Sequence, residues 1–149
     1  MSLGRIFQTT DSLSLTVLRL ALGAVMFPHG AQKMLGWFGG NGFSGTMGGF
    51  QHMGIPAVFA FLAIAAEFFG GLGLIAGFLS RIAGFGILCN MAVAVLMVHA
   101  PNGLFMNWTG RQKGEGFEFH LLAMAISVAV MIGGGGAFSL DRALARRGR

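Results

Sequence analysis

The sequence predicts an all-α membrane protein, a bundle of four transmembrane helices formed by a single domain of residues 1–149. Three observations support this. Hydrophobic residues make up 54% of the chain and charged residues only 10%, whereas soluble domains carry about 25% charged residues. The mean hydropathy is +0.72. Four apolar runs also follow one another along the chain. Such a chain has too few polar residues to cover a soluble core, whereas a bilayer can cover apolar surface.

The first apolar run extends from residue 13 to residue 35, which is long enough to cross a bilayer with some tilt. Asp11 and Ser12 precede it as a plausible helix cap. Residues 36–55 are rich in glycine and aromatic residues. We expect them to form a loop in the membrane interface, with a short helix that starts near Ser44.

The second and third apolar runs cover residues 56–78 and 81–99, and only a tight turn at Ser80 separates them. They are therefore expected to form an antiparallel hairpin, which the sequence Ala-Pro-Asn-Gly after residue 99 ends. The fourth run covers residues 117–136. Its last four residues are glycines, so we expect its end to fray.

Basic residues predict the orientation of the bundle. Three of them, Lys33, Arg111 and Lys113, lie on the side away from the termini, and Arg19 lies inside the first run. On the side of the termini lie Arg5, Arg81, Arg142, Arg146, Arg147 and Arg149. This bias places both termini in the cytoplasm. The net charge of +5 is concentrated in the C-terminal tail, which indicates contact with anionic lipid and not with nucleic acid.

Two charged residues, Arg19 and Glu67, lie well inside apolar runs, where each requires a partner or a function. At about 1.5 Å per residue, Arg19 lies about 9 Å and Glu67 about 16 Å from the inner side of the membrane. The difference of about 7 Å is within reach of an arginine side chain. The sequence therefore predicts an Arg19–Glu67 ion pair, which either joins two helices or takes part in chemistry.

All four histidines fall in the outer third of this arrangement. Three interpretations remain open: a haem or copper site, a pocket for a quinone or another hydrophobic ligand with a polar head, and side chains that only cap helices and fill gaps. No metal-ligand motif is visible, so we assign no metal and favour a quinone over haem or copper. The histidines are His29, His52, His99 and His120.

Two further polar residues belong to the third run. Asn90 is nine residues from His99, so the two face opposite sides of one helix, and Asn90 is expected to bond a neighbouring helix. Cys89 is the only cysteine, so no intrachain disulfide forms. We expect it to be a small buried hydrophobic residue.

The chain resembles the DoxX family of small bacterial membrane proteins. The resemblance rests on LRLALGAVMFPHGAQKMLGWFGG at 18–40, AAEFFGGLGLIAGFLSRIAG at 65–84 and GFEFHLLAMAISVAVMIGGGGAFSLDRAL at 116–144. Phe138 stands where the family more usually has an arginine. The positions that match the polar motifs of the family are Arg19, His29, Gly30, Lys33, Glu67, Gly71, Arg81 and Glu118.

The resemblance implies a multi-pass protein of the bacterial inner membrane, similar to the small membrane subunit of thiosulfate:quinone oxidoreductase. We therefore expect a membrane component of a quinone-linked or thiol-linked redox system. It would bind a hydrophobic ligand near the outer leaflet and work with a protein partner. A scaffold or assembly factor and a small transporter remain alternatives. The expected site consists of Arg19, His29, Lys33, Glu67, Glu118 and His120. The sequence leaves open the substrate, any catalytic residue and self-association.

Overall fold

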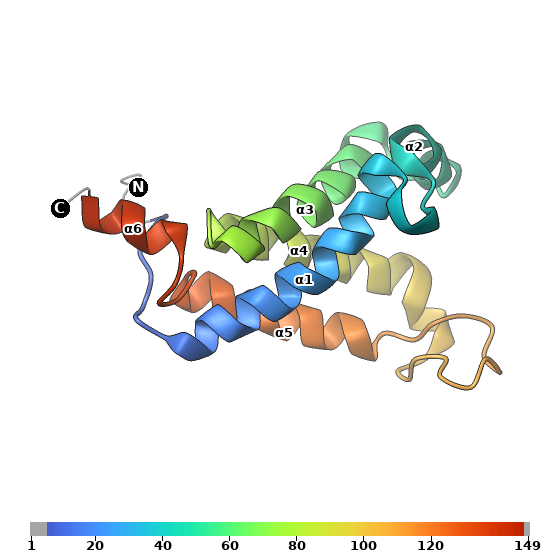
Figure 1. Ribbon diagram of the computed structural model, residues 1–149. Helices are drawn as coiled ribbons and strands as arrows, with labels where there is room; N and C mark the ends of the chain where they lie inside the picture. The colour runs from blue at the N-terminus through green and yellow to red at the C-terminus, as the bar shows by residue number, and fades with distance from the viewer. Residues whose placement is uncertain (1–5, 148–149) are drawn as a thin grey trace.

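The computed structural model describes residues 6–147, and within them it contains helices and no strands (Figure 1). A 3-10 turn, η2 (Trp37–Gly39), follows α1. A π-helical segment, η3 (Val95–His99), and a 3-10 turn, η4 (Ala100–Asn102), prolong α4. The α-helices are α1 (Leu13–Leu35), α2 (Gly42–His52), α3 (Ala57–Ala76), α4 (Ser80–Ala94), α5 (Glu118–Gly133) and α6 (Leu140–Arg147).

Three helices among the described residues are long and apolar enough to cross a membrane. They are α1, α3 and the continuous helical stretch Ser80–Asn102, with mean hydropathies of 1.3, 2.1 and 2.0. The helix α5 is apolar but has only 16 residues. An all-helical membrane protein, as predicted, is thus the architecture that this structure supports.

The first predicted helix and the short helix near Ser44 are confirmed as α1 and α2. The second run ends earlier than predicted, because Gly77 adopts a left-handed conformation (φ 68°) that stops α3. The fourth run ends at Gly133 and not at 136. The last helix, α6, was not predicted.

Glycines allow α1 and α3 to pack backbone against backbone. A Cβ atom on Gly30 would lie 2.4 Å from the Phe68 nitrogen, and one on Gly71 would lie 2.7 Å from the Phe27 nitrogen. Small residues permit this approach in a bilayer, where no hydrophobic effect drives helices together. Gly23, one turn before Phe27, meets the backbone of α3 in the same way. This contact fixes the position of α1 along the length of α3.

The four long helices form two pairs that diverge toward one end. The helix α1 packs on α3, α4 packs on both α3 and α5, and the α1–α5 contact is smaller. In Figure 1, α1 and α5 approach each other near the chain termini and separate toward α2 and the 103–117 loop. The buried core between the helices consists of Leu22, Met26, Leu74, Ile87, Met91, Ala123 and Val130.

The outward faces of the helices are apolar. Phe59, Phe69, Phe85 and Leu122 are between 56% and 67% exposed. Trp37 and Trp108 lie in segments at the end away from the termini and are 52% and 84% exposed. This surface suits lipid contact.

We predict that Gly30→Ala lowers the stability of the purified protein in detergent by about 1–3 kcal/mol, because the added methyl group meets the backbone of α3. The measurement is thermal or denaturant unfolding. The control is Gly49→Ala in α2, where a Cβ meets nothing within 4 Å. Equal stability of the two variants would contradict the close approach of α1 and α3.

Candidate functional site

Arg19 is 2% exposed and binds backbone carbonyls near the terminal end of the bundle. Its Nε donates to the Gly135 oxygen at 2.6 Å. Its Nη1 donates to the oxygens of Leu74 and Ile75 at 2.6 and 2.8 Å. Its Nη2 donates to the oxygen of Phe138. Leu74 and Ile75 belong to the last turn of α3, whose carbonyls have no partner within the helix.

The predicted Arg19–Glu67 ion pair is therefore wrong. The sequence places both residues in the membrane but does not show in which direction a long side chain extends. Arg19 extends toward the end of α3, where a planar guanidinium can donate to several carbonyls at once. A cation is also favourable beside the negative end of the α3 dipole. Arg19 thus connects α1, α3 and the α5–α6 loop, and it is not free to contact a ligand.

Asp141 completes this end of the fold. It is 1% exposed, and its two carboxylate oxygens accept from the backbone nitrogens of Leu79 at 2.7 Å and Ser80 at 2.9 Å. The carboxylate therefore caps the N-terminus of α4. In the sequence, Asp141 stands out only as part of residues 116–144, which resemble the DoxX family. We call Arg19, Asp141 and the backbone groups that they bind the terminal network.

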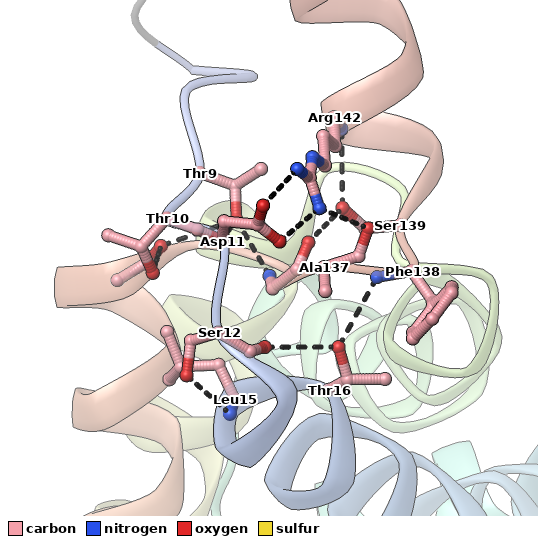
Figure 2. A network of polar contacts seen from close by, with 12 residues as sticks. Thr9, Thr10, Asp11, Ser12, Leu15, Thr16, Ala137, Phe138, Ser139 and Arg142 are labelled. Carbon is pink, nitrogen blue, oxygen red and sulfur yellow. Dashed lines mark hydrogen bonds and ion pairs between the residues drawn. The ribbon is translucent and has the colours of Figure 1, made fainter.

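The chain before α1 packs on the glycine run after α5, as Figure 2 shows. The Ser12 oxygen accepts from the Ala137 nitrogen at 3.1 Å, and Thr9 Oγ1 accepts from the Gly136 nitrogen at 2.7 Å. A Cβ on Gly136 would lie 2.6 Å from the Ser12 oxygen. All four glycines are buried. The run was expected to fray, but it is tightly packed because the missing side chains let two backbone segments meet.

Three polar side chains from three helices form the first part of the candidate site. They are Lys33 of α1, Glu67 of α3 and Asn90 of α4. Glu67 is 4% exposed. One of its oxygens accepts from Lys33 Nζ, and the other accepts from Asn90 Nδ2 at 2.7 Å. The prediction that Asn90 bonds a neighbouring helix is confirmed. We call this group the Lys33–Glu67–Asn90 cluster.

The cluster satisfies a buried carboxylate with one charged and one neutral donor. A carboxylate in a low-dielectric interior is costly unless it is paired and hydrogen-bonded. Lys33 is the more accessible member, since its side chain is 27% exposed against 6% for that of Glu67. The ammonium has three donor positions, so it can bind Glu67 and still donate to a second group.

Two histidines meet at the start of α5. The ring centroids of His99 and His120 are 4.1 Å apart. His99 Nδ1 lies 2.8 Å from the Glu115 oxygen, whereas the buried Nδ1 of His120 has no partner. His120 is 7% exposed. Because buried polar atoms are normally paired, this nitrogen marks a place where a polar group of a ligand would be stabilised.

The π-helical segment η3 carries His99 to this position. Such segments are rare and frequently occur at functional sites. His29 of α1 lies near the two histidines, with Phe119 as a shared neighbour. The Phe119 ring centroid is 6.4 Å from that of His29 and 5.5 Å from that of His120. His52, by contrast, ends α2 and is exposed.

Glu118 lies at the start of α5 and contacts the preceding loop. Its Oε1 accepts from the Met106 nitrogen at 2.9 Å and from Trp108 Nε1 at 3.0 Å. Glu118 therefore holds the 103–117 loop on α5.

The expectation for Cys89 is wrong, because the thiol is exposed on the outside of α4. In the described part of the chain, no three His, Cys, Asp or Glu side chains converge to hold a metal ion.

The structure thus divides the six expected site residues. Lys33 and Glu67 lie together, and Asn90 joins them. His120 lies against His99, with His29 nearby. Arg19 belongs to the terminal network, and Glu118 belongs to the 103–117 loop. Gly30, which follows His29, contacts the backbone of Glu67 and Phe68, so the cluster and His29 lie at a similar depth in the bundle.

Comparisons with known proteins agree with this architecture. A family model described as DoxX matches residues 14–100. The chain is also similar to a Bacillus subtilis (strain 168) protein named putative oxidoreductase CatD, with 28% identity over 127 residues. The alignment covers 84% of this chain and 82% of that relative. No solved structure matches the chain.

We predict that Arg19→Lys destabilises the protein by at least about 2 kcal/mol. The planar guanidinium binds four carbonyls, and an ammonium cannot reproduce this geometry. Each hydrogen bond to a charged group contributes about 1.5–3 kcal/mol. The measurement is unfolding in detergent. Arg111→Lys, in the exposed loop of the other end, is the control. An Arg19→Lys protein as stable as that control would show that the carbonyl contacts contribute little.

Proposed function

The chain belongs to the DoxX family, and we propose that it is the membrane component of a quinone-linked or thiol-linked redox system. In this proposal it binds a hydrophobic ligand with a carbonyl-bearing head, such as a quinone. The site lies between the Lys33–Glu67–Asn90 cluster and the histidines, in the half of the bundle away from the termini.

The observation that carries this proposal is the Lys33–Glu67–Asn90 cluster. A purely structural contact between three apolar helices does not need two charges, since apolar side chains of similar volume are often at least as stable. A ligand carbonyl, however, requires a donor in an apolar environment. Lys33 supplies one, and Glu67 and Asn90 hold it in position.

His120 supports the same conclusion. Its Nδ1 is buried without a partner, and a neutral imidazole can accept a proton at one ring nitrogen while it donates the proton of the other. Reduction of a quinone to a quinol takes up two electrons and two protons. In this proposal His120 and His99 pass protons to the ligand. A partner oxidoreductase supplies the electrons. A redox role is in keeping with the name of the relative, putative oxidoreductase CatD.

The proposal includes four spans, with both termini in the cytoplasm and the protein in the bacterial inner membrane. The fourth span is α5, whose 16 residues measure about 24 Å. This length is less than the roughly 30 Å thickness of the hydrocarbon core. The buried glycines that follow α5 lengthen the segment. The arginines of α4 and α6 lie at the end that carries the termini, in agreement with the positive-inside bias.

A reporter fused after Arg149 tests this topology. A fluorescent protein in that position is expected to fluoresce, and an alkaline phosphatase is expected to be inactive, because both would remain in the cytoplasm. An active phosphatase with a dark fluorescent protein would contradict the proposed orientation.

The double substitution Lys33→Met with Glu67→Gln tests the ligand site. It removes the donor without leaving a buried charge unpaired, so the protein is expected to fold. Affinity for a short-chain quinone, measured in nanodiscs by quenching of tryptophan emission, is expected to fall roughly tenfold or more, since a hydrogen bond to a charged group is lost.

The matched control is His52→Gln, an exposed residue at the end of α2, which should leave quinone affinity unchanged. If the double variant binds quinone as the native chain does but no longer associates with its native partner, the cluster serves assembly. The quinone proposal is then wrong.

A further inference from the structure

The end of the bundle that carries the termini contains a polar cavity of about 460 Å³. Its walls are residues 8–11 before α1, Arg81 at the start of α4, and one face of α6 with Arg142, Ala145 and Arg146. We propose that this cavity, the terminal cavity, binds a phosphate group. The proposal is independent of the ligand site in the other half of the bundle.

Charge is the first argument. Three guanidinium groups line the cavity, from Arg81, Arg142 and Arg146, against one carboxylate, that of Asp11. Asp11 is already paired with Arg142. Among the described side chains, neither Arg81 nor Arg146 has a carboxylate within 4.0 Å. The cavity therefore has a net charge of about +2, and an anion would compensate it.

Rigidity is the second argument. Arg81 donates through Nε and Nη2 to the Gln8 oxygen at 3.2 and 3.0 Å, and through Nη1 to the oxygens of Met131 and Ile132. These bonds hold its guanidinium at the cavity wall. Arg142 is held by Asp11 and by the Ala137 oxygen at 3.0 Å, as Figure 2 shows. These contacts leave one N–H of Arg81 Nη2, and Nε–H with one N–H of Nη2 on Arg142, to donate to a ligand. Charged N–H groups held in place suit phosphate oxygens.

The third argument is an adjacent apolar cavity of about 340 Å³, which shares Arg142 and Arg146 with the terminal cavity. Its walls include Ala76, Phe138 and Leu140, and the last two are 75% and 51% exposed. A phosphate group in the terminal cavity thus has apolar surface beside it. This arrangement fits an anionic phospholipid, whereas a free phosphate ester would use the polar cavity alone.

Native mass spectrometry of the delipidated full-length protein tests the proposal. Dioleoyl phosphatidylglycerol is titrated against dioleoyl phosphatidylcholine, and inorganic phosphate is titrated by calorimetry in a separate arm. We expect Arg146→Gln to weaken binding of the phosphate group about fivefold, as expected for one basic residue near an anionic surface. Ala145→Glu, which adds a carboxylate to the cavity, should weaken it further.

Neither substitution is expected to disturb the fold. Arg146 is exposed, and Ala145 lines the open cavity. Arg111→Gln, an exposed arginine in the loop at the other end, is the matched control and should bind as the native chain does.

The two arms distinguish the source of the phosphate. Loss of phosphatidylglycerol binding in both cavity variants identifies a lipid headgroup, and loss of inorganic phosphate binding identifies a soluble phosphate ester. If Arg146→Gln and Ala145→Glu bind both ligands as tightly as the control, the cavity is not a phosphate site and the proposal is overturned.

Discussion

The guanidinium of Arg19 and the four carbonyls that it binds connect most of the fold. It joins α1 to the last turn of α3 and to the loop between α5 and α6. Asp141, from the segment after that loop, caps α4. All four long helices are therefore tied together at one end through backbone groups at helix ends and in loops, which need polar partners in an apolar environment. In the other half of the bundle, the polar contacts include the Lys33–Glu67–Asn90 cluster and bonds within residues 99–118, and there α1 and α5 diverge.

This asymmetry separates the tightly connected end of the bundle from the half that carries the candidate site. The glycine contacts of Gly23, Gly30 and Gly71 fix α1 against α3 at a set depth. The Lys33–Glu67–Asn90 cluster then adds a polar connection between α1, α3 and α4 in the half away from the termini. Polar side chains in the membrane are costly. In the proposed function, their position in the diverging half makes them available to a ligand.

The residues of the candidate site were largely predictable, but their partners were not. Glu67 was identified because an ionisable group in an apolar run needs a partner or a function, and Lys33 because it matches a polar motif of the family. Asn90 was predicted to bond another helix, but nothing in the sequence connected it with Glu67. Arg19 was assigned the wrong partner because depth arithmetic treats a carboxylate as the natural partner of a guanidinium. A comparison of depths alone leaves out the carbonyls at the end of a neighbouring helix, which are also acceptors for a guanidinium.

The sequence by itself determined that the chain is an apolar, helical membrane protein, because composition and the length of apolar runs depend on the chain alone. It also determined the position of α1, since Ser12 and Gly36 are local end signals. The tertiary structure decided which polar groups meet, why Gly133–Gly136 are buried, and that Cys89 faces outward. These features depend on helix rotation and on contacts between residues such as Thr9 and Gly136, more than a hundred positions apart. No local pattern encodes such contacts.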